Sequence, residues 1–102
     1  MATRPDTAVK PATDSARRTF DVAIVGAGYV GVPLAQAFAE AGHAVLLVDV
    51  DAERVDKLNS GESYIEDVPS ETIGRLVGDH GLRATTDYEE IHERDAILIA
   101  LP

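Results

Sequence analysis

Short apolar runs recur along the chain from residue 20 onward, and each is bounded by glycine or by polar residues. The run DVAIV, which ends at residue 25, and the run AVLLV, which begins at residue 44, are too short for typical helices. Such runs predict strands that are buried on both faces of a sheet, over roughly residues 20–25 and 44–49. The run DAILIA at 95–100 resembles the first in composition and predicts a further strand, whereas 82–86 is a weaker strand candidate.

A helical period separates the first two predicted strands. Its apolar residues recur at the spacing of one helix face, which predicts a helix that ends at Gly42 and buries Val30, Leu34, Ala37, Phe38 and Ala41. Pro33 is unexpected there because proline has no backbone N–H to donate. If the helix begins near Tyr29, Pro33 removes one backbone hydrogen bond or shifts the start of the helix.

Polar residues with helix-capping chemistry divide the second half of the chain. Asp51 precedes a short helical segment, and Ser70 marks the start of a second helix after a turn-rich stretch. Asp87 predicts a short helix through His92. Strands that alternate with helices specify an α/β fold with a parallel sheet and right-handed crossovers.

The loop after the first strand, GAGYVG, holds three glycines within six residues. Because glycine loses conformational entropy wherever the chain is ordered, this density needs a reason. In a strand-to-helix turn with this spacing, Gly26 permits the tight turn, Gly28 leaves room for a pyrophosphate, and Gly31 lets the helix pack closely on the strand. The pyrophosphate accepts hydrogen bonds from unpaired N–H groups at the helix N-terminus, so the backbone alone can neutralise it.

An acidic residue at the end of the second strand strengthens this interpretation. Asp49 lies 23 positions after Gly26, close to the ~20 positions of dinucleotide-binding units. Dinucleotide binding is therefore favoured over a purely structural tight turn. The predicted fold class is a Rossmann-type doubly wound parallel sheet, of which the chain holds the N-terminal portion.

The same carboxylate bears on the choice of cofactor. Asp49 would accept both hydroxyls of the adenosine ribose and repel a 2′-phosphate, so it predicts NAD rather than NADP. Asp51 competes for this role but is better explained as a helix N-cap. Arg54 could lie across the adenine side of NAD, pair on the surface with Asp51 or Glu53, or bind a 2′-phosphate, which the carboxylate at position 49 makes the least favoured.

The charge of the chain excludes one class of partner. A formal net charge of −9 at pH 7 has the wrong sign for a phosphate backbone, so we expect no nucleic-acid binding. Residues 1–19 hold four basic and two acidic side chains, a net of +2, which leaves −11 on the remainder. Because this segment has no apolar period, we expect a disordered leader over 1–19 and a partial NAD-binding domain over 20–102.

The sequence has neither cysteine nor long apolar stretches, and both features bear on the cellular compartment in which we expect the protein. Without cysteine the chain can form neither a disulfide nor a thiol nucleophile, which agrees with a reducing cytosol. No apolar stretch approaches the roughly 18 residues that suggest a membrane span. We therefore expect a cytoplasmic protein without membrane association.

The remaining polar residues give weaker signals. His43, His80 and His92 are far apart in sequence and lack metal-ligand spacing, so no metal site is predicted. Ser63 and Tyr64 lie in a loop and could touch a ligand, although loop packing explains them better. No residues in the sequence form a nucleophile-and-base set, so no catalytic residue is assigned.

Longer stretches of the sequence resemble a single family. Five pieces of the chain are similar to the N-terminal NAD-binding domain of the UDP-glucose/GDP-mannose dehydrogenase family. They are Gly-Tyr-Val-Gly with Pro33-Leu34, the strand end Val48-Asp49-Val50-Asp51, Arg54, and the later LRATTDYEEI and DAILIALP. The resemblance extends from residue 20 to the end. Within the family, the segment GESYIE at 61–66 looks more like the branch that acts on UDP-N-acetylhexosamines than the UDP-glucose branch.

The resemblance implies the function of a longer protein. Members of that family oxidise the C6 alcohol of a nucleotide sugar to a carboxylate in two NAD-dependent steps. It further implies a nucleotide-sugar substrate for the full-length parent, a cofactor-contacting loop that begins at Leu101-Pro102, and NAD contacts from Gly26, Ala27, Gly28, Tyr29, Val30, Gly31, Asp49 and Arg54. The family's catalytic cysteine, its assisting lysine and asparagine, and the sugar-binding domain lie downstream in relatives, so this chain is expected to be an inactive front portion of such an enzyme.

Two other interpretations remain open. The chain could be a stand-alone NAD-binding or regulatory module, or the front of an FAD-dependent oxidoreductase, although the second strand of flavoproteins usually ends in Glu where this chain has Asp49. A sheet ordered 3-2-1-4 would place the strand at 95–100 on a bare edge, with Asp95 as its only charged residue. That edge favours self-association, so we expect a homo-oligomer.

Overall fold

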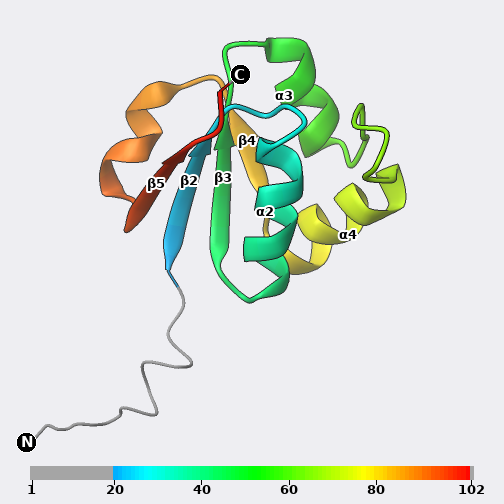
Figure 1. Ribbon diagram of the computed structural model, residues 1–102, viewed down its shortest axis with the longest axis horizontal. Helices are drawn as coiled ribbons and strands as arrows, with labels where there is room; N and C mark the ends of the chain where they lie inside the picture. The colour runs from blue at the N-terminus through cyan, green and yellow to red at the C-terminus, as the bar shows by residue number, and fades with distance from the viewer. Residues whose placement is uncertain (1–19, 102) are drawn as a thin grey trace, which may run out of the picture.

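Four parallel strands form the centre of the protein in the computed structural model, which describes residues 20–101 (Figure 1). The strands are β2 (Asp21–Val25), β3 (Ala44–Val48), β4 (Arg83–Thr85) and β5 (Ala96–Ile99). Their order in the sheet is β4-β3-β2-β5, which confirms the predicted α/β class and strand order. The leader expected over 1–19 lies outside the described residues, as does Pro102.

The strand register brings the carboxyl ends of the strands to one edge of the sheet. Val25 pairs with Val48 on one side and with Ile99 on the other, and all three residues close their strands. The loops that follow β2, β3 and β5 therefore begin side by side. In open α/β sheets, ligands bind outside this edge, where the strand order reverses. That reversal lies between β2 and β5 here.

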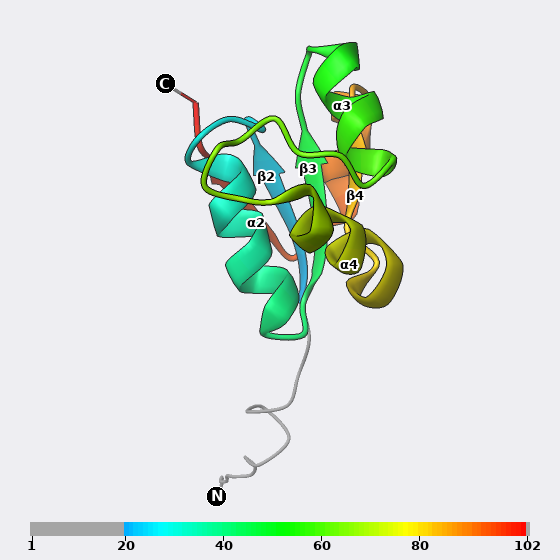
Figure 2. The same cartoon turned by 90° about the vertical axis from the view of Figure 1, so that its right-hand side faces the viewer.

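One face of the sheet is covered by three helices, α2 (Gly31–Glu40), α3 (Ala52–Asn59) and α4 (Ser70–His80) (Figure 2). Apolar side chains from these helices and from the α3–α4 loop pack against alternate strand residues in one buried cluster. The 3-10 helix η1 (Tyr88–Glu93) lies on the opposite face, where Ile91 packs against Val25, Leu46 and Val48. No helix among residues 20–101 is long and apolar enough to cross a membrane.

The buried face of α2 differs from the one predicted. Val32, Ala35 and Ala39 face the core, and Leu34 and Phe38 pack at its margin. Ala37 and Ala41 are exposed, so the prediction that they are buried was wrong, as it was for Val30, which is 65% exposed. Small side chains face the sheet because they let the helix approach the strands closely, and a prediction weighted toward larger apolar residues misses them.

Pro33 sets the start of α2. The N–H of Val32 donates to the carbonyl of Gly28, and the N–H of Leu34 donates to the carbonyl of Val30, each with an N···O distance of 3.1 Å. The intervening bond to Tyr29 is missing because proline has no N–H. The continuous helix therefore begins at Gly31, as expected if Pro33 removes one bond and shifts the start.

The other helices begin at or directly after the polar residues that predicted their starts. Asp51 caps α3 by accepting from the N–H groups of Glu53 and Arg54, and Asp87 caps η1 by accepting from Glu89. Helix α4 begins at Ser70 as predicted. The Ser70 hydroxyl, however, accepts from the N–H of Ser63 at 2.9 Å, so it fixes the preceding loop rather than capping the helix.

Candidate functional site

The candidate site lies at the edge of the sheet where the parallel strands end. The N–H of Gly26 donates to the carbonyl of Val48, and the N–H of Ala100 donates to the carbonyl of Val25, each with an N···O distance of 2.8 Å. These hydrogen bonds join the segments that follow β2, β3 and β5. A pocket of about 210 Å³ opens beside them. Its walls are formed by Gly26, Ala27, Gly28, Tyr29, Val30, Asp49, Arg54, Ala100 and Leu101.

The structure thus brings together nearly all the residues predicted to bind a cofactor. Gly31 does not line the pocket and instead packs beneath the loop. Leu101, where a further cofactor-contacting loop was expected to begin, forms part of the wall with Ala100. The contribution of Ala100 was not anticipated, because its place depends on the pairing of β5 with β2.

Gly26 and Gly31 are required by the fold. Gly26 has a φ of +111°, and a Cβ there would lie 2.7 Å from the carbonyl oxygen of Ala100. A Cβ on Gly31 would overlap the carbonyl oxygen of Gly26 at 1.7 Å. Any side chain at either position would therefore separate the loop from its neighbours.

Gly28 has no such packing reason. Its φ is not in the left-handed range, and the nearest atom to an added Cβ would be Nη1 of Arg54 at 3.8 Å, an ordinary contact distance. The protein itself therefore leaves room for a Cβ at this position. A glycine that the fold does not require, in the wall of a pocket, suits the close approach of another group to the backbone there.

Backbone donors surround this open position. Among residues 20–101, the N–H groups of Gly28, Tyr29 and Val30 have no protein acceptor. They precede the first turn of α2, where the helix dipole favours negative charge. Three donors and a helix N-terminus suit a phosphate or pyrophosphate group.

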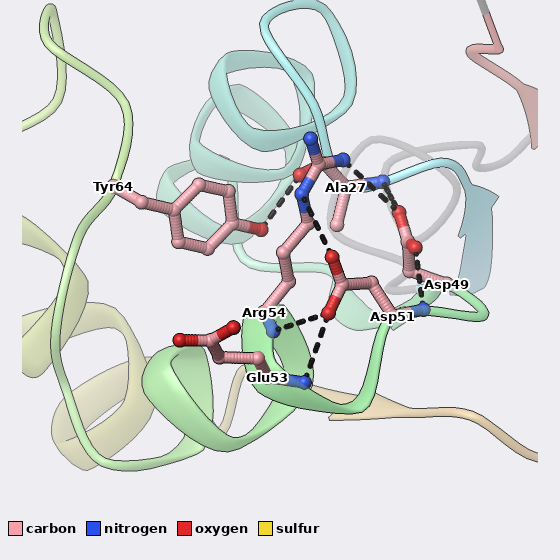
Figure 3. A network of polar contacts seen from close by, with 6 residues as sticks. All are labelled: Ala27, Asp49, Asp51, Glu53, Arg54 and Tyr64. Carbon is pink, nitrogen blue, oxygen red and sulfur yellow. Dashed lines mark hydrogen bonds and ion pairs between the residues drawn. The ribbon is translucent and has the colours of Figure 1, made fainter.

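Asp49 holds the floor of the site. The residue is 9% exposed, and its Oδ2 accepts from the N–H of Ala27 at 2.8 Å while its Oδ1 accepts from that of Asp51 at 2.9 Å (Figure 3). Each carboxylate oxygen retains a second lone pair for another donor. A buried carboxylate with spare acceptor capacity, beside an opening for an anion, suits a pair of hydroxyl groups.

Arg54 lies over the carboxylates. Its guanidinium is 3.6 Å from Asp49 and 3.7 Å from Asp51, with its side chain 43% exposed. Of the three alternatives left open for Arg54, the structure shows the pairing with Asp51 and adds Asp49 as a partner. Asp51 uses its other oxygen to cap α3, which agrees with its assignment as an N-cap.

Tyr64 is the residue that sequence reasoning underrated. It comes from the α3–α4 loop, yet its hydroxyl donates to the carbonyl of Ala27 at 2.6 Å, and its ring lies 5.5 Å from the guanidinium of Arg54. Burial raises the pKa of the Tyr64 hydroxyl to about 12, against an opposing effect of Arg54, so the group stays a donor at neutral pH. Nothing in the sequence pairs residue 64 with residue 27, because the contact depends on how the loop folds back.

The histidines take no part in this site. His43 accepts from the N–H of Phe20 through Nδ1, and His92 lies 3.3 Å from Glu89 on η1. Over residues 20–101, the structure shows no group of three or more His, Asp or Glu side chains placed to hold a metal ion.

The fold and the site together define a dinucleotide-binding domain of the Rossmann type, since the donors suit a pyrophosphate and the buried carboxylate suits a ribose. Residues 20–102 match the NAD binding domain of the UDP-glucose/GDP-mannose dehydrogenase family. The chain belongs to this family, and its matching part is the family's NAD-binding domain.

Individual members of the family are also similar to this chain in sequence. The chain is 47% identical over 83 residues to a UDP-glucose 6-dehydrogenase of Haloferax volcanii, covering 80% of this chain and 19% of that protein. It is 38% identical over 82 residues to a UDP-N-acetyl-D-mannosamine dehydrogenase of Salmonella typhi, covering 79% of this chain and 19% of the relative. The chain therefore spans about a fifth of the length of these relatives.

Solved structures agree with the sequence comparison. A UDP-glucose dehydrogenase from Pyrobaculum islandicum superposes with a TM-score of 0.75 at 33% identity, covering 82% of this chain and 20% of that one. A GDP-mannose dehydrogenase from Pseudomonas aeruginosa gives 0.73 at 30% identity, covering 79% and 19%. The resemblance inferred from the sequence motifs is confirmed.

Proposed function

We propose that the chain binds the adenosine and pyrophosphate part of NAD at the carboxyl ends of β2 and β3. The observation that carries this proposal is Gly28, which the fold leaves open in the pocket wall. It lies beside N–H groups that find no acceptor among residues 20–101 and beside the buried carboxylate of Asp49. The pyrophosphate would lie over residues 26–31, and Asp49 would accept the two ribose hydroxyls. Arg54 would cover the adenosine side, because its charge is already balanced by two carboxylates.

The proposed parent enzyme oxidises the C6 alcohol of a UDP-sugar to a carboxylate. Bound NAD would supply the hydride acceptor for each of the two oxidation steps. This chain's residues would bind and orient the cofactor, and no catalytic residue is assigned to them because the 102 residues include no cysteine for the family's covalent step. We expect the chain alone to oxidise no nucleotide sugar.

The proposed substrate class of the parent is a UDP-sugar. The relatives described above include both UDP-glucose and UDP-N-acetyl-D-mannosamine dehydrogenases. The GESYIE segment supports a UDP-N-acetylhexosamine, and the higher of the two identities supports UDP-glucose. Membership of the family favours this enzyme class over a stand-alone regulatory module or the front of an FAD-dependent oxidoreductase.

The preference for NAD over NADP tests the role of Asp49. Wild-type chain should bind NAD more tightly than NADP, because the 2′-phosphate would meet the Asp49 carboxylate. Asp49→Ala should weaken NAD binding at least tenfold, since hydrogen bonds to a charged group are each worth about 1.5–3 kcal/mol, and should narrow the difference between the cofactors. Calorimetric titration with both cofactors measures this.

Asp79→Ala is the matched control, because it removes an exposed carboxylate from α4, away from the pocket. It should bind both cofactors as the wild type does. Tighter binding of NADP than of NAD by the wild type would overturn the assignment of Asp49. Circular dichroism checks that Asp49→Ala still folds, since the change leaves the N–H groups of Ala27 and Asp51 without their acceptor.

A further inference from the structure

The α3–α4 loop is tied to the glycine-rich loop by one side chain. Tyr64 lies 37 positions after Ala27 in sequence, and its hydroxyl donates to the Ala27 carbonyl at 2.6 Å. Figure 3 shows the tyrosine reaching across to the start of this loop from the side opposite Asp49. The contact is short for an O–H···O hydrogen bond and connects two segments that the strands do not join.

We propose that Tyr64 is a positioning residue for the phosphate-binding loop, which it serves by fixing the Ala27–Gly28 peptide so that the Gly28 N–H faces the pyrophosphate. This inference rests on the proposed function. In a trans peptide the C=O and N–H groups point in opposite directions, and the described chain has no cis peptide bond. A carbonyl directed to Tyr64 therefore directs the Gly28 N–H away from Tyr64.

On this proposal, that N–H would point into the pocket. Gly28 lines the pocket, whereas Tyr64 does not. A hydrogen bond donated to the carbonyl also polarises the peptide and makes its N–H a better donor. Tyr64 thus both orients and strengthens one of the donors available to an anion.

Ala27 is held from both ends. Its N–H donates to Asp49 and its carbonyl accepts from Tyr64, so the two peptide units that flank it have little freedom to rotate. The Ala27 side chain is fully buried. A loop prepared in this way loses less conformational entropy when it binds an anion than a loop that must first become ordered.

The ring of Tyr64 has a second effect on the same site. It lies 5.5 Å from the guanidinium carbon of Arg54, within the range of a cation–π contact. Arg54 is therefore held between the ring and the carboxylates of Asp49 and Asp51. Tyr64→Phe keeps the ring and removes only the hydroxyl, so it separates the peptide contact from the arginine contact.

The first test compares two ligands that differ in their phosphates. Tyr64→Phe should weaken ADP binding about fivefold, the effect of losing one hydrogen bond of ordinary strength, and should leave adenosine binding unchanged. Tyr88→Phe is the matched control, because Tyr88 begins η1 outside the pocket and should bind both ligands as the wild type does. Calorimetry on the 102-residue chain measures all three proteins.

The outcomes separate this inference from the proposed function. Wild-type binding of ADP that Tyr64→Phe leaves unchanged overturns the inference alone. An equal loss for ADP and adenosine also overturns it, since the tyrosine would then support the fold rather than the phosphate donors. A wild-type chain that binds neither ligand overturns the proposed function and this inference with it.

A second test needs no ligand. In ¹⁵N-edited NMR spectra, Tyr64→Phe should shift the Gly28 amide resonance, because the carbonyl of the same peptide has lost its donor. Amides of α4 and β4 should keep their shifts, which shows that the fold is intact. A Gly28 amide that moves no more in Tyr64→Phe than in Tyr88→Phe overturns the inference.

Discussion

At the scale of single residues, Gly28 and Gly31 differ in what each glycine makes possible. A Cβ added at Gly31 would overlap the Gly26 carbonyl oxygen, whereas a Cβ added at Gly28 would meet only Nη1 of Arg54, at an ordinary contact distance. The sequence motif predicted both roles: the structure shows the close packing at Gly31, and the pyrophosphate over Gly28 stays a prediction. The residue-level contacts of Tyr64 could not be predicted, because they depend on the path of an irregular loop.

The ionisation of Tyr64 provides a prediction at this scale. The chain has three tyrosines, and burial raises the pKa of Tyr64 from 10.0 to about 12. Because the protonated hydroxyl is favoured by the fold, Tyr64 contributes stability below pH 10 that is lost as the pH rises toward 12. Absorbance titration at alkaline pH should therefore show a late component that Tyr64→Phe removes and Tyr88→Phe keeps. Loss of the late component in Tyr88→Phe instead would contradict this.

At the scale of elements, α2 shows which features of a helix its hydrophobic pattern predicts. The existence and end of the helix were predicted correctly, and its buried face was not. Helical period alone could not decide between the face with Leu34 and Phe38 and the face with Ala35 and Ala39. The close approach of the helix to β2 and β3 selected the face with the smaller side chains.

A pair of substitutions in α2 tests the corrected face. Ala35→Leu should lower the free energy of unfolding by about 1–3 kcal/mol, because Ala35 is fully buried and the added atoms overpack the core. Ala37→Leu, two positions on and exposed, should change it by less than about 0.5 kcal/mol. Urea unfolding measures both. Equal costs, or a larger cost at position 37, would restore the face predicted from the sequence.

At the scale of the whole molecule, the parallel sheet was the most predictable feature. Short apolar runs predicted the strands, and the rule for doubly wound sheets predicted their order. The exposure of β5 followed from that order rather than from its composition, which resembles that of buried β2. Ile97 and Ile99 of β5 are 47% and 67% exposed, and both lie on the face opposite α2.

The edge of β5 leads to a prediction about assembly. The 102-residue chain should form oligomers as its concentration rises, because β5 presents apolar side chains and backbone groups for pairing. Ile99→Lys should reduce association, whereas Ala37→Lys, with the same added charge on the exposed side of α2, should not. Light scattering over a concentration series distinguishes them. A monomer at every concentration would count against the edge strand as an association surface.

The central claim is that the space over Gly28 receives the pyrophosphate of NAD, and a calorimetric titration of NAD into three proteins tests it most directly. Wild-type chain and Gly78→Val should bind alike, because an added Cβ at Gly78 on α4 would meet nothing within 4 Å. Gly28→Val should lose NAD binding and keep its secondary structure, since an added Cβ there meets no protein atom closer than 3.8 Å and the side chain would fill the space left for the ligand. If Gly28→Val binds NAD as tightly as the wild type, the glycine-rich loop is not the phosphate site.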